Sequence, residues 1–235
     1  MIRIVFIMTI LYFLIGALAI YRMGNKSDPT GTRQPWVKYL VYLFIVTSMI
    51  LVIYFTDWFR FLAFGMVSIC LYELAQVAGK SKVKSSRFFY TSLVTFLLMA
   101  ALFFQFSLYC PPAELLLVYV MVFTFDGFSQ IFGQLFGKHL LFPAISPSKT
   151  WEGLIGGLLL SFATMYLLSH SSGKPLSFPK SLLLVLAAFA GDVFSSAYKR
   201  VYGVKDYSRL IPGHGGMLDR FNSFLSAGSV YYVVQ

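Results

Sequence analysis

The stretch that decides the fold is KYLVYLFIVTSMILVIYFTDWFRFLAFGMVSICLYELAQVA, residues 38–78. It contains two apolar segments, each close to the roughly 20 residues that an α-helix needs to cross a bilayer. Only Thr56-Asp57 separates the two segments. Two such segments in immediate succession predict a helical hairpin that crosses a membrane twice, and therefore an integral membrane protein.

The composition of the whole chain agrees with this prediction. Of its 235 residues, 58% are hydrophobic and 12% are charged, whereas soluble globular proteins have about 45–50% and about 25%. These values exclude a single soluble domain, a disordered chain, collagen and a coiled coil. The formal net charge of +10 would suit a nucleic-acid-binding protein. In a membrane protein, however, loop lysines and arginines mainly set the topology, so we expect no nucleic-acid partner.

Outward from residues 38–78, the hydropathy pattern predicts eight membrane-spanning helices. They cover residues 2–21, 38–55, 58–78, 88–107, 114–132, 154–169, 181–198 and 218–234. The first should be retained, because its apolar region is longer than the 7–15 residues of a signal peptide. The expected fold class is therefore all-α: a polytopic membrane protein with a polar, cytoplasm-facing pocket in its C-terminal half. We expect one membrane domain over residues 1–235, with N-terminal helices in 1–110 and a catalytic half in 111–235.

The positive charges alternate between the two sides of these helices. Fourteen lysines and arginines fall on one set of alternate connections and four on the other, with Arg220 inside the last span. The positive-inside rule places the basic connections in the cytoplasm. Both termini are then outside, and we expect a multi-pass protein of the cell (inner) membrane.

Acidic side chains stand out where the spans are otherwise apolar. Asp192 lies within the seventh span, where an ionised carboxylate costs at least about 2.5–3.5 kcal/mol. Asp192, Ser196 and Lys199 share one helix face, because they are spaced i, i+4 and i+7. This stripe predicts a pocket wall that opens to the cytoplasm; the alternative is an Asp192–Lys199 ion pair that serves packing alone. For Glu73, in the third span, a structural hydrogen bond and a functional role are equally open.

A second acidic residue, Asp219, begins the next helix. If Asp192 and Asp219 approach each other from adjacent helices, they form a hard-oxygen site. Such a site suits Mg²⁺, which binds through one or two carboxylates together with substrate phosphates. The three histidines and two cysteines are too dispersed along the chain to predict a zinc site.

Two segments beside these acids predict phosphate binding. Residues 212–216, Pro-Gly-His-Gly-Gly, are flanked by cations and can turn backbone N–H groups toward an anion. Whether His214 contacts a phosphate or only holds this loop is left open. Residues 146–153, Ser-Pro-Ser-Lys-Thr-Trp-Glu-Gly, precede the sixth helix. A helix N-terminus attracts anions, and Thr150 is also a good N-cap residue.

Together these motifs resemble a known family. Residues 196–200 (SAYKR), 205–206 (KD) and 212–221 (PGHGGMLDRF) are similar to the signature of the phosphatidate cytidylyltransferases, or CDP-diacylglycerol synthases. Residues 146–153 and 126–138 resemble two further motifs of that family. The resemblance implies a membrane enzyme that joins CTP to phosphatidate, releases pyrophosphate and CDP-diacylglycerol, and requires Mg²⁺. The implied partners are the two substrates and the lipid bilayer, and a homodimer is a possible assembly.

The resemblance also implies roles for individual residues. Asp192, Ser196, Lys199 and Asp219 match catalytic positions, and Asp192 and Asp219 match the metal-binding ones. The residues expected to bind substrate are Asp126, Ser146, Lys149, Thr150, Arg200, Lys205, Asp206, Gly213, His214, Gly215, Gly216 and Arg220.

One departure from the family pattern concerns its last position. The signature usually ends in Asp-Arg-Phe-Asp, whereas this chain has Asn222 at the end. This departure leaves open a catalytically weak homologue that acts as a scaffold. Two further alternatives to the transferase are a related CTP-dependent lipid kinase and a transporter, which eight spans with an intramembrane Asp would suit.

Overall fold

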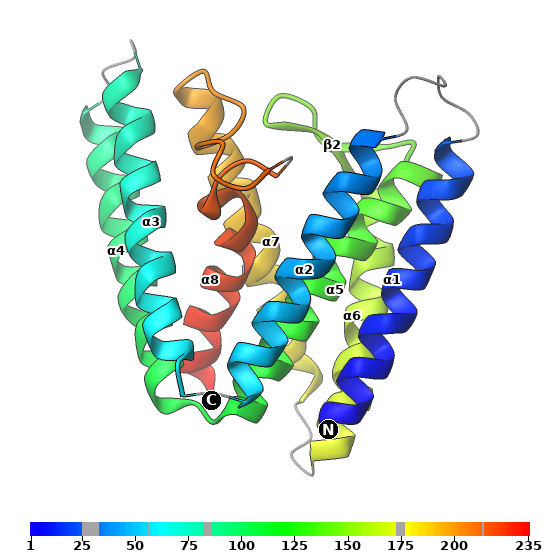
Figure 1. The fold of residues 1–235 in the computed structure, drawn as a ribbon. Coiled ribbons are helices and arrows are strands. Elements are labelled where there is room, and N and C mark those ends of the chain that lie inside the picture. Colours follow the sequence, from blue (N-terminus) through cyan, green and yellow to red (C-terminus); the bar gives the residue numbers. More distant parts are fainter. Residues whose placement is uncertain (25–32, 56, 82–85, 173–176, 213) are drawn as a thin grey trace.

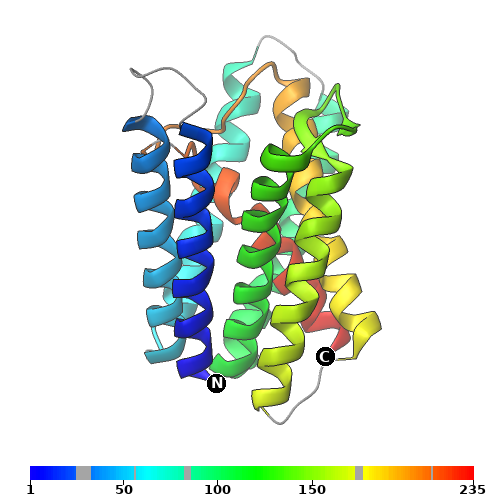
Figure 2. The same ribbon diagram turned by 90° about the vertical axis from the view of Figure 1, so that its right-hand side faces the viewer.

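The computed structural model describes residues 1–24, 33–55, 57–81, 86–172, 177–212 and 214–235. Within these residues the chain forms eight helices and one small two-stranded sheet. The helices stand side by side in a bundle, with both termini at the same end (Figures 1 and 2). Seven of the described helices are long and apolar enough to cross a membrane. The prediction of a polytopic, mainly α-helical membrane protein is thereby confirmed.

All eight predicted helices are present, most of them a few residues longer than predicted. Their bounds are α1 Ile2–Gly24, α2 Arg33–Phe55, α3 Phe59–Lys80, α4 Ser86–Tyr109, α5 Pro112–Phe136, α6 Trp151–Ser172, α7 Phe178–Val201 and α8 Met217–Val234. Strands β1, Leu140–Phe142, and β2, Ser146–Thr150, form an antiparallel hairpin between α5 and α6. The sequence had predicted no strand there.

Helix α8 is the one that falls short of a membrane span by length and composition. It packs against α3, α4, α5 and α7, and Figure 1 shows it in the middle of the bundle, beginning below the upper ends of α3 and α7. A helix surrounded by protein need not present an apolar surface to lipid, so it tolerates polar and small residues. This explains why α8 can contain three serines, an asparagine and a glycine.

The predicted hairpin of α2 and α3 reverses the chain direction, but the two helices pack on different partners. Helix α2 packs on α1 and α5, whereas α3 packs on α4 and α8. Figure 1 shows α2 and α3 separating toward the upper end of the bundle. A pocket bounded by α2, α5 and α8 lies on this side of the bundle.

Glycines set the closest helix contacts. A Cβ at Gly157 of α6 would lie 2.0 Å from Oγ of Ser129 on α5, and one at Gly191 of α7 would lie 2.7 Å from Cβ of Ser226 on α8. Because these positions lack side chains, α6 approaches α5 and α7 approaches α8 closely. The α7–α8 contact matters for function, since both helices carry predicted site residues.

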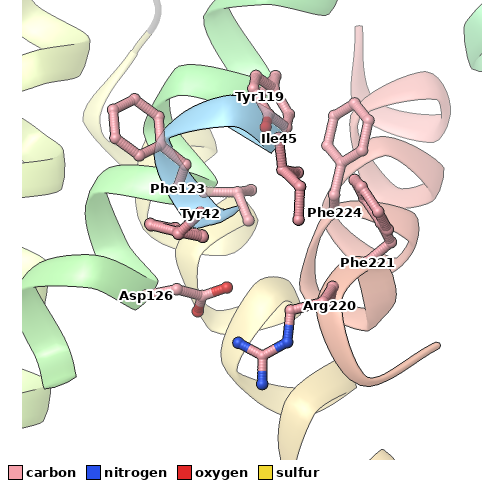
Figure 3. Close-up of a pocket in the computed structure, with 9 residues that line it drawn as sticks. Tyr42, Ile45, Tyr119, Phe123, Asp126, Arg220, Phe221 and Phe224 are labelled. Atoms are coloured by element: carbon pink, nitrogen blue, oxygen red, sulfur yellow. The ribbon is translucent and has the colours of Figure 1, made fainter. Parts of the chain in front are cut away.

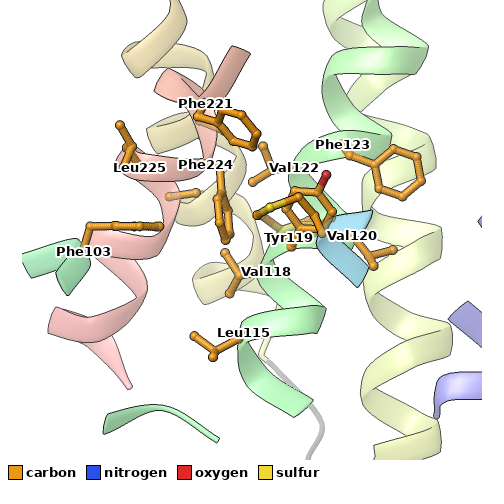
Figure 4. Packing of buried hydrophobic residues seen from close by; sticks show 14 of the residues in the cluster. Phe103, Leu115, Val118, Tyr119, Val120, Val122, Phe123, Phe221, Phe224 and Leu225 are labelled. Atoms are coloured by element: carbon orange, nitrogen blue, oxygen red, sulfur yellow. The ribbon is translucent and has the colours of Figure 1, made fainter. Parts of the chain in front are cut away.

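Aromatic side chains fill the space around α8. The ring of Phe224 packs edge-on against Phe103 of α4 and Tyr119 of α5, with ring centroids 5.2 and 5.1 Å apart (Figure 4). Phe103 and Phe224 are almost fully buried. This apolar core packs around α8 just after its first turns, and those first turns carry the polar residues of the site.

Candidate active site

The polar motifs predicted from the sequence gather at one end of the bundle. They come from the end of α5, from β2 and the start of α6, from the end of α7, and from residues 202–220. Figure 1 places these segments at the end opposite to the two chain termini. Helices that are distant in sequence therefore supply side chains to one region.

Asp192 of α7 forms an ion pair with Lys149 of β2. The side-chain amide of Asn222, on α8, donates to its Oδ1 over 3.3 Å. The Asp192 side chain remains 34% exposed, so a ligand can reach it. Lys149 is held against α7 by the ring of Phe189, whose centroid lies 4.8 Å from Nζ. Asp192 therefore pairs across the bundle, and the ion pair with Lys199 considered from the sequence is not formed.

Asp126, near the end of α5, belongs to the same group of side chains. The hydroxyl of Ser223 donates to its Oδ1 over 3.4 Å. Ser223 directly follows Asn222, whose side-chain oxygen accepts the Ser223 backbone N–H over 2.6 Å. We call Asp126, Asp192, Asn222 and Ser223 the acidic cluster. It brings two carboxylates, an amide oxygen and a hydroxyl together around the first turns of α8.

Asp219 has a separate set of partners. Its Oδ1 lies 2.6 Å from Nζ of Lys199, and its Oδ2 accepts the backbone N–H groups of Tyr207 and Gly216, each over 2.8 Å. The Asp219 side chain is 2% exposed and that of Lys199 is 12% exposed. The sequence paired Asp192 with Asp219, whereas among the described side chains Asp192 is joined through α8 to Asp126.

The glycine-rich segment turns as predicted, and His214 secures it. Gly215 has a φ of +83°, a conformation that favours glycine. Nε2 of His214 lies 2.7 Å from the carbonyl oxygen of Lys38 on α2; because a carbonyl only accepts, the imidazole must donate here. The His214 carbonyl in turn accepts from Nε of Arg220 over 2.9 Å. Burial, together with the charges of Arg220 and Lys38, lowers the pKa of His214, so its ring is neutral near pH 7.

The backbone donors of this segment are partly used within the protein. The N–H of His214 donates to the carbonyl of Ile211 over 2.9 Å, and that of Gly216 donates to Asp219. In this state these two amides do not form the phosphate cradle predicted for residues 213–216. Gly213 itself lies outside the described residues. The contacts of His214 match the alternative in which it holds the loop.

Two predicted residues of the β-hairpin have clear local roles. Thr150 is the N-cap of α6, since its hydroxyl oxygen accepts the N–H of Gly153 over 3.1 Å; this prediction is confirmed. Ser146 pairs with Phe142 in the hairpin. The hairpin thereby holds Lys149 one residue before the α6 N-cap and in reach of Asp192.

The remaining predicted residues lie at the end of α7 and just after it. Arg200 donates through Nε to the carbonyl of Ile145 over 3.1 Å, which joins α7 to the β-hairpin. Ser196 is buried on α7, whereas Lys205 and Asp206 are exposed. Lys205 is therefore accessible to a soluble ligand.

A pocket lies between α2, α5 and α8, next to the acidic cluster (Figure 3). At one end Asp126 and Arg220, both described residues, face each other without forming an ion pair. Elsewhere the walls are apolar or aromatic, so we call this space the aromatic pocket. Its walls include Tyr42, Ile45, Tyr119, Phe123, Phe221 and Phe224.

Besides the apolar walls of the aromatic pocket, Tyr42 and Ser223 contribute to the site without having been predicted. Tyr42 lines the aromatic pocket and its ring stacks on His214 with centroids 6.1 Å apart. Nothing in the sequence indicates that α2 lies beside the start of α8. Ser223 is the second, and its only signal is that it follows the family signature by one residue.

The donor atoms suit Mg²⁺ better than a transition metal. Among the described residues, no three His, Cys, Asp or Glu side chains gather as a ready-made metal cage. Mg²⁺ does not need one, because it is commonly held by one or two carboxylates with water and substrate phosphates. The acidic cluster offers only hard oxygen donors around a partly exposed Asp192. The residues present therefore fit this ion.

Comparisons with known proteins identify the same family that the sequence motifs resemble. A sequence model described as "Cytidylyltransferase family" matches residues 2–235. The phosphatidate cytidylyltransferase of Haemophilus influenzae is 30% identical over 258 aligned positions, which cover 94% of this chain and 89% of that protein. The phosphatidate cytidylyltransferase of Staphylococcus aureus is 42% identical over 115 residues, 47% of this chain and 44% of that protein. The matching region therefore spans less than half of the staphylococcal protein.

Proposed function

Because this chain belongs to the cytidylyltransferase family, we propose that it transfers the cytidylyl group of CTP to phosphatidate, forming CDP-diacylglycerol in phospholipid synthesis. The observation that carries the proposal is the acidic cluster with Lys149, together with the Lys199–Asp219 pair, at one end of a membrane bundle. We also propose that this end faces the cytoplasm of a bacterial inner membrane, because it carries the basic connections. CTP is a cytoplasmic solute and phosphatidate a membrane lipid, so the two substrates can meet there.

The reaction requires alignment and charge neutralisation more than a protein nucleophile. A phosphate oxygen of phosphatidate attacks the α-phosphorus of CTP, the bond from that phosphorus to the β-phosphate oxygen breaks, and pyrophosphate leaves with the bonding electrons. The triphosphate of CTP and the phosphate of phosphatidate must be brought together against their mutual repulsion. We assign Lys149, Lys199 and Arg200 to neutralising the triphosphate, and the exposed Lys205 is a further cation near them in sequence.

Asp192 and Asp219 are the proposed Mg²⁺ ligands, with Asp126 beside Asp192 as a further oxygen donor. For Asp219 this requires that its carboxylate exchange the bond to Lys199 for the ion. When bound, the ion would supply positive charge to the α-phosphate and to the leaving pyrophosphate. Asn222 donates to Asp192 in this state, so it orients that carboxylate without adding a negative charge. This is a chemical reason for an enzyme of the family to function with asparagine at this position.

We propose that phosphatidate binds at the aromatic pocket on the chemistry of its lining, since the cavity of about 30 Å³ is only large enough for water and the lipid would have to displace side chains. A lipid with a phosphate head needs a cation at one end of its site and apolar walls along the rest. The aromatic pocket has Arg220 at one end and apolar side chains of α2, α5 and α8 elsewhere. Its polar end is formed by Asp126, a member of the acidic cluster, so a lipid phosphate bound there lies next to the proposed reaction centre.

Filling the aromatic pocket is expected to weaken lipid use selectively. Ile45→Trp places a larger ring in the pocket and should raise the KM for phosphatidate about 10-fold, while the KM for CTP stays within about twofold, since the lysines that neutralise its phosphates are untouched. Turnover is measured in mixed micelles in which the mole fraction of phosphatidate and the CTP concentration are varied separately. Phe44→Trp is the matched control, because Phe44 is on the same helix and 73% exposed. Equal changes in both KM values would contradict this placement of the lipid.

The purified protein with CTP, phosphatidate and Mg²⁺ tests the proposed function. We expect pyrophosphate and CDP-diacylglycerol in equal amounts. A lipid kinase would instead release CDP and phosphorylate the lipid, and a transporter would move solute across liposomes without consuming CTP. An Asn222→Asp variant is assayed in parallel; activity in that variant alone would identify this chain as a catalytically weak homologue.

A further inference from the structure

Glu73 of α3 is a buried carboxylate that the proposed mechanism does not use. Its side chain is 2% exposed, and it lies well inside a helix long and apolar enough to span a membrane. A charged group in such a place is expensive and requires partners. Its partners therefore indicate what it does.

All the described partners of Glu73 belong to the segment that leads into α8. Oε1 accepts the hydroxyl of Ser208 over 2.6 Å and the backbone N–H of Met217 over 3.0 Å, and Oε2 accepts the N–H of Leu218 over 2.8 Å. Met217 and Leu218 are the first two residues of α8, whose N–H groups have no acceptor within the helix. Glu73 thus caps α8 from a neighbouring helix. A Cβ at Gly216 would lie 2.5 Å from Oε1, so glycine at this position leaves room for the carboxylate.

Glu73 and Asp219 hold the same segment from two sides. Glu73 binds Ser208, and Asp219 binds the backbone N–H of the preceding residue, Tyr207. Asp219 also binds the N–H of Gly216, while Glu73 binds the next two amides of the chain. The two carboxylates together satisfy three consecutive amides at the start of α8. The position of Asp219, and of Lys199 bound to it, therefore depends on where Glu73 holds this turn.

We propose that Glu73 is a positioning residue for the cytidylyl transfer, which fixes the start of α8 so that Asp219 and Lys199 are held ready for the metal and the nucleotide. This inference rests on the proposed function. Glu73 touches neither the acidic cluster nor the aromatic pocket in the described structure. It acts through Ser208 and the start of α8.

Glu73→Gln tests the proposal, because glutamine has a similar size but only one accepting oxygen. Hydrogen exchange of the purified protein should show faster exchange at the amides of residues 217 and 218. Binding of Mn²⁺ in the presence of CTP, followed by electron paramagnetic resonance, should weaken about 10-fold or more, as for other residues that orient metal ligands. Turnover should fall by a similar factor. A change in Mn²⁺ affinity is the result expected if Glu73 positions the site. A mere loss of folded protein would lower the number of binding sites without changing their affinity.

Two further variants keep the test decisive. Ser208→Ala removes one donor and should weaken Mn²⁺ binding about 2- to 10-fold, which provides a milder variant if Glu73→Gln does not fold. Gln76→Ala is the matched control on α3; its amide binds Tyr72 on the exposed side of the helix, and we expect no change. Faster exchange at residues 217 and 218 with unaltered Mn²⁺ affinity and turnover would overturn the inference and leave the proposed function standing. Absence of CTP-dependent turnover in the unmodified protein would instead refute the proposed function, and this inference with it.

Discussion

Asp192→Asn is expected to lower the CTP-dependent turnover of phosphatidate about 100-fold or more. The substitution keeps the shape of the side chain but removes the charge that pairs with Lys149 and that would hold Mg²⁺. Because the Asp192 side chain is 34% exposed, its loss of charge should alter stability little. The measurement is pyrophosphate release by the purified variant at saturating CTP and phosphatidate, with its melting temperature recorded beside it.

Asp57→Asn is the matched control for this prediction. Asp57 is an exposed residue in the short connection between α2 and α3, at the end of the bundle opposite to the site (Figure 1). The same chemical change there should leave turnover as it is. If Asp192→Asn kept a tenth or more of the original turnover, the assignment of Asp192 to the reaction centre would be wrong.

Lys199→Met is expected to affect both activity and stability. It removes a cation proposed to neutralise the triphosphate, so turnover should fall about 100-fold. It also leaves the 2%-exposed carboxylate of Asp219 without its ion-pair partner, and breaking a buried pair in this way costs about 3 kcal/mol. The second effect is measured as a lower melting temperature in detergent micelles.

The double variant Lys199→Met/Asp219→Asn separates the two effects. Removing both charges takes away the unpaired carboxylate, so we expect most of the lost stability to return while activity stays low. Lys80→Met is the control, because Lys80 is an exposed lysine at the end of α3. A double variant no more stable than Lys199→Met would show that the pair does not stabilise the start of α8.

The helices were predictable because each span of a polytopic protein is marked by its own local run of apolar residues. The alternating charges also predicted which connections share one end of the bundle. The neighbours of each helix were not predictable in the same way. Helix α8 was predicted as one of eight spans, and it is enclosed by α3, α4, α5 and α7. Its serines suit that environment, but they do not say which helices surround it.

The candidate site shows the same division. Helical spacing placed Asp192 and Lys199 on the same face of α7. It could not predict which side chains each of them binds. Asp192 forms an ion pair with Lys149, which lies on a β-hairpin that was not predicted. Lys199 forms its ion pair with Asp219. Glu73 was visible as an acid in an apolar span, while its target, the first turn of α8, depends on a contact between residues more than 140 positions apart.

The two ion pairs have a consequence for how the substrates bind. Lys149 pairs with Asp192 and Lys199 pairs with Asp219, so the charges of these four side chains balance one another. A nucleotide that drew both lysines away by itself would leave two carboxylates uncompensated beside its own phosphates. A nucleotide that brings a divalent cation exchanges partners instead, with phosphates taking the lysines and the cation taking the carboxylates. If the site works as proposed, we expect metal and nucleotide to bind jointly more tightly than either binds alone.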